Sequence, residues 1–345
     1  TVSFDTNGNP VSASATYLVK YPRESKPKFA RRCELAYYSS PLARVTSKFV
    51  SYIATKPVGR DIKNPLMQAV QDDVDGKGNN ISVFFQDFMV EAKARGSMLL
   101  LVDMPSVIPE NLSTQLAERK APYWTPIAPE LLKEYEIADD GKFDSAEFSG
   151  NYKDAEGKSQ SGTWYFDRQK WQCKDKDGNV VVEGEHNLGE CPLLISTESG
   201  DFPCFGSFAP IADLSKRLFN IDSELDEILR SQTFSLLTLE VPPDKTATQT
   251  KEIAQTVGET IGTNILMCHA GSTPAFIAPP DGPAQVYMER IKDIRAQISE
   301  TGMEVATITQ QESGLAMQLR FQSINAELAR FSARMEDLER RAWAI

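Results

Sequence analysis

The sequence is poor in the residues that build metal sites and disulfides. Its 345 residues include five cysteines and two histidines, and no two cysteines form a C-x-x-C pair. Zinc sites need several Cys or His ligands at short spacings, so neither a bound metal nor another cofactor is expected. Scattered cysteines without a pairing pattern also indicate free thiols in a reducing compartment.

Other absences exclude whole classes of protein. No signal peptide is present and no apolar run approaches the roughly 18 residues of a membrane span, so we expect no membrane association. The phosphate-binding patterns G-x-x-x-x-G-K-[ST] and G-x-G-x-x-G are missing, which excludes the common nucleotide-dependent enzymes. Positive charge is scarce as well, because 37 basic and 48 acidic residues give a net charge of −11. Phosphate contact relies on clustered Lys and Arg, so a general nucleic-acid-binding surface is not expected.

Two acidic stretches imitate calcium loops. Residues 73–80, DVDGKGNN, begin like an EF-hand loop, but the twelfth position holds Phe84 instead of a bidentate Glu. Residues 175–179, DKDGN, fail the same test. Both stretches are typical of solvated turns, and the second indicates a hairpin.

The two histidines are the candidates for a catalytic base, and each stands alone. His186 lies in GEHNLGECP and His269 in MCHAG, outside any H-E-x-x-H pattern. His269 adjoins Cys268, but adjacent residues on a strand point to opposite faces. Nucleophilic catalysis needs a base beside a nucleophile, and no such pair is visible. The sequence therefore predicts no catalytic residue and a protein that is not an enzyme.

The remaining composition is that of a globular protein of two or three domains, with 41% hydrophobic and 25% charged residues. Helical spacing over residues 26–54 predicts two helices that Pro41 separates. Residues 81–95 predict a third helix that Gly96 ends, and an apolar run from residue 97 to Pro105 has the length of a buried strand.

Short strands with turn signals follow between residues 121 and 195. Residues 164–173 and 180–182, on either side of the turn at 177–179, indicate an antiparallel meander. The first 200 residues are therefore predicted to be an α+β unit, which begins with a polar N-terminal arm of about 21 residues.

Long helices dominate the second half. Apolar residues at steps of three and four predict a first long helix; they are Ile211, Leu214, Leu218, Ile221, Leu225 and Ile228. Short strands and a small helix near residues 249–256 predict an α/β insert. A second helix should open near Pro283, with Tyr287, Ile291, Ile294 and Ile298 on one stripe.

The stretch TITQQESGLAMQLRF, from residue 307 to residue 321, changes character halfway. Its β-branched and amide-rich first half predicts an irregular segment. Ser313 is the expected N-cap of a long helix, whose apolar stripe runs in steps of four and three from Ile324 to Ile345. Because this stripe is still running at Ile345 and the first residue is Thr1, we expect a piece of a longer protein.

This order of elements resembles the portal, or head-to-tail connector, proteins of tailed bacteriophages. GSFAPIADLSKRLFNIDSELDEILRSQ looks like the first stem helix of that family, and ESGLAMQLRFQSINAELARFSARMEDLE looks like the start of its spine helix. FARRCELAYYSSPLARVTSKFVSYIATKP and GEHNLGECPLLI look like parts of its wing. The resemblance covers residues 17–345, and it rests on the order and spacing of motifs that are individually weak.

The resemblance implies an α+β portal fold that lacks the C-terminal crown of the family. The implied divisions are an N-terminal arm and wing (1–207), a first stem helix (208–233), a clip (234–282), a second stem helix (283–305), a tunnel loop (306–312) and a long spine helix (313–345).

The family's function is the second implication. The chain would form a homo-oligomeric ring, a dodecamer in particles, at one capsid vertex of a virion assembled in the host cytoplasm. The ring would pass double-stranded DNA without sequence specificity during packaging and ejection. Its partners would be terminase, adaptor or connector proteins at the clip, and capsid and scaffolding proteins. ATP hydrolysis would belong to the terminase.

The implied DNA contacts lie in the tunnel loop, whose residues are Thr307, Ile308, Thr309, Gln310, Gln311 and Glu312. Uncharged polar side chains suit a loop that touches DNA without holding it. On the second stem helix, Lys292 and Arg295 would either form a positive collar in the channel or pair with acids of a neighbouring subunit, and we favour pairing.

A physical argument accompanies the resemblance. Narrow apolar stripes on three long helices need neighbours to cover them, and a symmetric ring supplies one on each side. Two alternatives stay open: an enzyme with a helical dimerisation bundle and a site near His186 or His269, and another phage structural protein such as a scaffold or adaptor.

Overall fold

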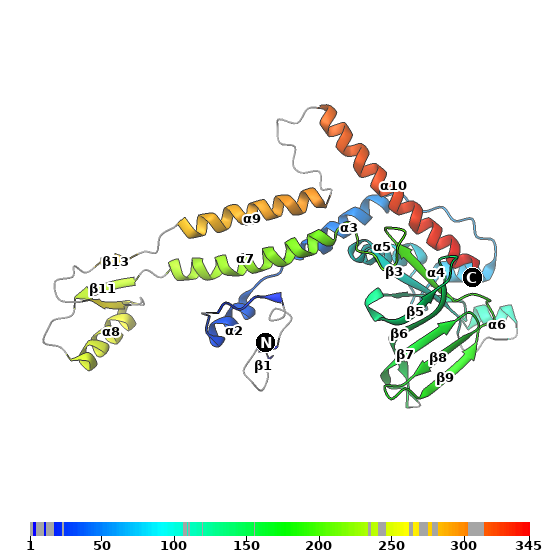
Figure 1. The fold of residues 1–345 in the computed structure, drawn as a ribbon, viewed down its shortest axis with the longest axis horizontal. Helices are drawn as coiled ribbons and strands as arrows, with labels where there is room; N and C mark the ends of the chain where they lie inside the picture. Colours follow the sequence, from blue (N-terminus) through cyan, green and yellow to red (C-terminus); the bar gives the residue numbers. More distant parts are fainter. Residues whose placement is uncertain are drawn as a thin grey trace. The chain divides into compact units, whose positions relative to one another are not determined.

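The computed structural model describes residues 3–4, 10–11, 17–22, 24–105, 109, 111–118, 120–154, 156–233, 236–240, 246–261, 265–268, 275–277, 282–302 and 314–345. The chain divides into two units (Figure 1). The hairpin unit comprises residues 1–40 and 213–300, and the sheet unit comprises residues 41–212 and 301–345. The predicted wing range of 1–207 included residues 1–40, which fall in the hairpin unit here.

Two β-sheets form the framework of the sheet unit. A three-stranded antiparallel sheet has the order β10-β3-β4, and a five-stranded antiparallel sheet has the order β5-β6-β7-β8-β9. Their bounds are β3 Ser97–Asp103, β4 Tyr123–Ile127, β5 Leu132–Ile137, β6 Phe143–Lys153, β7 Ser159–Asp167, β8 Lys170–Lys174, β9 Val180–Glu185 and β10 Leu193–Thr197.

The two sheets pack against each other through alternate residues of β3. Leu99 and Leu101 face the five-stranded sheet, where they share a buried core with Phe148 and Phe166. Successive side chains of a strand point to opposite faces, so Leu100 faces the other way, and it too is fully buried. Both faces of β3 are therefore covered, and the buried strand predicted from this apolar run is confirmed.

Helices cover the second face of the three-stranded sheet. α5 Ile81–Arg95 packs on β3 and α10 Gly314–Ala344 packs on β10. α3 Pro41–Ile53 packs on both of these helices, α4 Pro65–Asp72 packs on α5, and the short α6 Leu112–Ala117 lies between β3 and β4 in the chain. Asn80 caps α5 by accepting hydrogen bonds from two backbone N–H groups, and Gly96 ends it in the left-handed conformation with φ of 85°. Trp124 of β4 fixes the packing, because its ring contacts Phe85 of α5 and Trp343 of α10.

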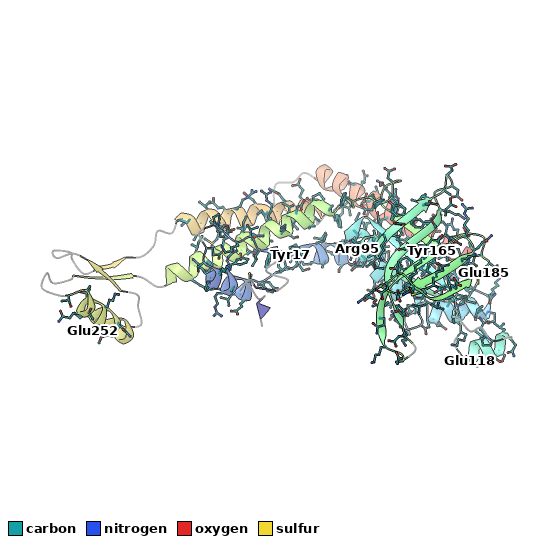
Figure 2. The ribbon with its side chains drawn as sticks, turned by 60° about the horizontal axis from the view of Figure 1, so that its bottom comes forward. Tyr17, Arg95, Glu118, Tyr165, Glu185 and Glu252 are labelled. Atoms are coloured by element: carbon teal, nitrogen blue, oxygen red, sulfur yellow. The ribbon has the colours of Figure 1, made fainter. Side chains whose placement is uncertain are left out.

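The hairpin unit is built on two antiparallel helices that lie side by side (Figures 1 and 2). They belong to α7 Ala209–Thr233, whose first turn lies in the sheet unit, and α9 Gly282–Thr301. The remaining elements are α2 Lys26–Leu35, α8 Ala247–Ile261, and the strands β1 Ser3–Phe4, β2 Pro10–Val11, β11 Leu236–Glu240, β12 Ile265–Cys268 and β13 Ala275–Ile277. β11 pairs in parallel with β12 and antiparallel with β13, so the insert between the long helices is the predicted small α/β element.

The mixed helix and sheet content agrees with the predicted α+β class. The two helices on either side of Pro41, the helix that Gly96 ends and the antiparallel meander are confirmed. The meander itself covers β5 to β9, because β4 and β10 join β3 instead. The predicted small helix is longer than 249–256, and α4 and α6 were not predicted. The predicted N-cap Ser313 lies outside the described residues.

The argument that the apolar stripes lack cover within one chain is wrong for two helices. On α10 the stripe residues Ile324, Phe331 and Leu338 are buried, and on α9 Ile291 and Ile294 are buried. Helical periodicity identified the buried faces correctly, but the chain covers them itself. A ring is therefore not needed to shield these stripes.

Candidate functional site

Specific polar contacts tie α7 to α9. Glu224 of α7 accepts hydrogen bonds from the hydroxyl of Tyr287 on α9, at 2.6 Å, and from the hydroxyl of Tyr21 in the N-terminal segment. The hydrogen bond to Glu224 is the main cause that raises the pKa of Tyr287 to about 12, so this hydroxyl stays a donor at neutral pH. One carboxylate thus joins three segments that are far apart in sequence.

A buried arginine completes the attachment of the N-terminal segment. The guanidinium of Arg32 donates to both carboxylate oxygens of Glu24, at 2.9 and 2.8 Å, to Ser223 Oγ of α7 at 3.1 Å, and to the carbonyl of Val19 at 2.6 Å. Burial opposes ionisation of Glu24, but the hydrogen bonds from Arg32 and from the Tyr21 N–H, together with the positive charges of Arg32 and Lys28, outweigh it and hold the pKa of Glu24 below its usual value. A bidentate pair of this geometry fixes orientation as well as distance.

The structure places both predicted charges of the second stem helix on the exposed surface of α9. Arg295 pairs with Asp222 of α7, with Nη2 3.7 Å from Oδ2, so it finds an acid within its own chain. Lys292 lines a shallow groove beside this pair and has no ion-pair partner among the described residues. The predicted loop residues, Thr307, Ile308, Thr309, Gln310, Gln311 and Glu312, lie outside the described residues.

Charges of both signs alternate along the exposed surface of α9. The exposed acids are Glu289, Asp293 and Glu300, and the exposed bases are Arg290, Lys292 and Arg295. Phosphate binding depends on the number of cations that the nucleic acid can reach, and each cation here has an acid within a helical turn or two. The exposed surface of α9 is therefore not a cluster of positive charge.

A buried lysine, which no local sequence pattern distinguishes from other lysines, anchors α10 at Glu327. Lys93 of α5 is fully buried, and its Nζ lies 2.6 Å from Glu198 Oε1 and 3.0 Å from Glu327 Oε1 of α10. It also donates to Ser207 Oγ at 2.9 Å. The contact with Glu198 is an ion pair without the alignment of a hydrogen bond.

Three phenylalanine rings surround the same ammonium group. Nζ of Lys93 lies 4.5 Å from the ring centroids of Phe49 and Phe208 and 5.4 Å from that of Phe331. We call this set of five side chains, together with Lys93, the Lys93 cage: Glu198, Glu327, Phe49, Phe208 and Phe331. It draws α3, α5, α10 and the segment before α7 to one point.

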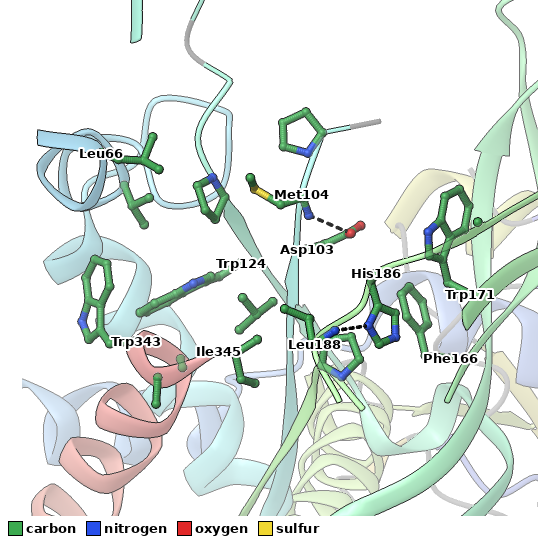
Figure 3. A pocket seen from close by; sticks show the side chains of 18 of the residues that line it. Leu66, Asp103, Met104, Trp124, Phe166, Trp171, His186, Leu188, Trp343 and Ile345 are labelled. Carbon is green, nitrogen blue, oxygen red and sulfur yellow. Dashed lines mark hydrogen bonds between the residues drawn. The ribbon is translucent and has the colours of Figure 1, made fainter. Parts of the chain in front are cut away.

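His186 sits at the edge of the five-stranded sheet with both ring nitrogens occupied. Its Nε2 lies 2.9 Å from the carbonyl of Asp167, and its Nδ1 accepts a hydrogen bond from the Leu188 N–H at 3.3 Å (Figure 3). Both ring nitrogens therefore already have hydrogen-bond partners within the chain. This arrangement argues against His186 as a catalytic base. His269 lies outside the described residues.

The two calcium-like stretches are turns held by their own carboxylates. Asp75 accepts hydrogen bonds from the Lys77 N–H and from the Asn79 side chain, and Asp175 does the same with Asp177 and Asn179. The hydrogen bond from the Asn179 side chain is the main cause that lowers the pKa of Asp175. Within the described residues no cluster of His, Cys, Asp or Glu could hold a metal ion.

Four of the five cysteines are free thiols: Cys33, Cys173, Cys191 and Cys204. Burial raises the pKa of the Cys191 thiol to about 11, which keeps it protonated and unreactive. Among the described residues, no helix combines the length and apolar character that crossing a bilayer requires.

Among known proteins, similarity to this chain was found only in solved structures. No protein-family model matches the chain, and no curated protein matches it significantly. A chain from the neck of an empty gene transfer agent particle, computed with C6 symmetry, is 11% identical with a TM-score of 0.42, over 92% of this chain and 81% of that one. A chain from the virion of a native gene transfer agent particle is 10% identical with a TM-score of 0.37, over 87% and 80%. No family membership follows from these values.

Proposed function

We propose that this chain is a portal-type subunit, which assembles with copies of itself into a ring at one vertex of a phage capsid. The order of elements in the second half carries the proposal. Two antiparallel helices of 25 and 20 residues enclose a small α/β insert, and a 31-residue helix follows a polar segment. In this proposal α7 and α9 are the stem, residues 234–282 the clip, and α10 the spine helix.

The contacts around Glu224 and Arg32 support a stem that acts as a rigid strut. A lone pair of helices about 30–37 Å long, at 1.5 Å per residue, is easily bent. Here Tyr287 crosslinks the two helices, and the buried Arg32–Glu24 pair attaches a third segment to α7. Such bracing suits a channel wall that must keep its shape while DNA moves.

Subunit contacts in the proposed ring would use exposed apolar side chains, because the stripes of α9 and α10 are already covered. In the hairpin unit Tyr37 is 78% exposed and Val286 is 65% exposed, and in the sheet unit Phe205 is 92% exposed. In the proposed ring, a neighbouring subunit would cover these side chains. The partners of the ring would be terminase, adaptor proteins at the clip, and capsid and scaffolding proteins, with double-stranded DNA in its channel.

The mass of the assembled particle tests the proposal directly. Twelve copies of the 38.3 kDa chain give a ring of about 460 kDa. We expect light scattering to detect a species of several hundred kilodaltons, and electron microscopy to show rotational symmetry around a central hole. Tyr37→Ser should weaken this assembly without unfolding the chain, because the side chain is exposed. A stable monomer or dimer at all concentrations would contradict the proposal and favour an adaptor or a scaffold.

A second experiment addresses the proposed tunnel loop. Replacing Gln310 and Gln311 with Ala should leave the rings intact and impair DNA packaging or retention, because the loop would lose its hydrogen bonds to the sugar-phosphate surface. The matched control is Gln255→Ala in α8, which changes the same kind of side chain outside the loop. Normal packaging and normal retention by the double variant would argue against DNA contact by this loop.

A further inference from the structure

The strand β9 is an unpaired edge of the five-stranded sheet. Among the described strands it pairs only with β8, with Gly184 opposite Trp171, and the backbone N–H of His186 donates to the carbonyl of Gln169 at 2.9 Å. Hydrogen-bonded residues alternate along an antiparallel strand, so the backbone groups of Glu183 and Glu185 face away from β8. Within the described part of the chain these outward N–H and C=O groups form no backbone hydrogen bond.

A groove of about 860 Å³ runs beside this edge (Figure 3). One wall consists of β9, Trp171 and Leu188, and the other includes Leu66 of α4 and Met104 at the end of β3. Several apolar side chains of the lining are at least a third exposed: Met67, Met104, Val182 and Leu188. Exposed apolar side chains next to free backbone hydrogen-bonding groups are the two features that an added strand uses.

The charge of the groove selects the kind of strand that fits it. Its charged lining residues are Asp103, Glu183 and Glu185, and its described lining contains no Lys or Arg. The Asp103 carboxylate already accepts hydrogen bonds from the Tyr123 hydroxyl and the Met104 N–H, both at 2.8 Å. The Glu185 carboxylate has no partner among the described residues, and Figure 2 shows this side chain on the five-stranded sheet.

We propose that β9 is a docking strand for an extended peptide segment of a partner protein, in which apolar side chains alternate with Lys or Arg. The backbone of the segment would pair with the outward groups of Glu183 and Glu185. Its apolar side chains would enter the groove, and its cations would lie near the two carboxylates. The same carboxylates would repel acidic strands and would gain no ion pair from neutral ones, so a free edge can coexist with a specific partner. This inference does not depend on the ring proposal.

Synthetic peptides test both parts of the inference. The probe is an acetylated and amidated peptide of seven residues with alternating Val and Lys, and the charge control has Glu in place of Lys. The third peptide keeps Val and Lys but carries N-methyl groups on alternate amides, which blocks strand pairing at unchanged charge. Isothermal titration calorimetry should show binding of the first peptide, and at least tenfold weaker binding of the other two. Binding should also change the fluorescence of Trp171, which lines the groove.

Variants locate the binding at β9. Exposed ion pairs contribute about 0.2–1 kcal/mol each, so Glu183→Gln with Glu185→Gln should weaken binding of the Val and Lys peptide about fivefold. The matched control Glu156→Gln removes an exposed carboxylate from the turn between β6 and β7 and should change nothing. The proposal is wrong if the peptides with Lys and with Glu bind equally, if N-methylation has no effect, if no peptide binds, or if the double variant binds as well as the control.

Discussion

Loss of the positive charge of Lys93 should destabilise the sheet unit strongly. Lys93→Met keeps most of the apolar stem of the side chain and removes the ammonium group, together with its contacts with the rings of Phe49, Phe208 and Phe331. Removing one partner of a buried ion pair typically costs about 3–5 kcal/mol, because the other charge stays buried without compensation. The side chains of Glu198 and Glu327 are 13% and 23% exposed, so water relieves part of this cost. We therefore expect a loss of about 3 kcal/mol, at the lower end of that range.

Urea denaturation followed by tryptophan fluorescence measures this loss in the correct unit. All four tryptophans of the chain, Trp124, Trp164, Trp171 and Trp343, belong to the sheet unit. The matched control is Lys63→Met, because Lys63 is 87% exposed and its ion pair with Asp61, at 3.9 Å, should contribute less than about 1 kcal/mol.

A compensating variant separates charge burial from simple loss of packing. In Lys93→Met combined with Glu198→Gln and Glu327→Gln, no uncompensated charge is left, so at least half of the lost stability should return. Two results would contradict this reasoning: a free energy of unfolding of Lys93→Met within about 1 kcal/mol of that of the original chain, or a triple variant no more stable than the single one. Either would mean that the ammonium group does not stabilise the Lys93 cage.

Two further predictions concern the hairpin unit and the start of β3. Glu24→Gln should destabilise the hairpin unit by about 2–4 kcal/mol at pH 7, because it leaves the buried Arg32 without its carboxylate. Since the pKa of Glu24 is lowered in the folded state, this difference in stability should be present above the unfolded pKa of about 4.3 and vanish as pH falls through the folded pKa. Unfolding followed by circular dichroism at 222 nm at several pH values would measure it. Gly96→Ala should lower the thermal midpoint of unfolding far more than Gly141→Ala. Both glycines have positive φ, but a Cβ at Gly96 would lie 2.0 Å from the backbone nitrogen of Gly206, whereas a Cβ at Gly141 would have nothing within 4 Å. Equal losses in the two variants would refute the steric argument.

Capping residues, glycines and turn residues in the sequence predicted those helices and strands whose ends such residues determine. The helix that ends at Gly96 has a capping residue at one end and a glycine at the other, and the meander has turn residues between its strands. The short α4 carries the same kind of signal, since Asn64 caps it and Pro65 opens it, but eight residues are too few for a clear apolar period.

The Lys93 cage had no such signal, because its members come from distant parts of the chain. Lys93 is separated by 114 residues from Ser207 and by 234 from Glu327. In the sequence it looks like an ordinary lysine on an amphipathic helix, where a charged residue is normally exposed. Burial of a charge depends on which segments meet there, and a single sequence does not contain that information.

The covered stripes change where contacts between copies should be sought. A period of three and four residues shows that a helix has a buried face, but not whether the same chain or a neighbour covers it. Since α9 and α10 are covered by their own chain, contacts in a ring must involve side chains that remain exposed after folding, such as Tyr37 and Phe205. Substitutions at these two positions should therefore alter assembly without loss of stability, whereas substitutions at Ile294 or Leu338 should unfold the subunit before they affect assembly.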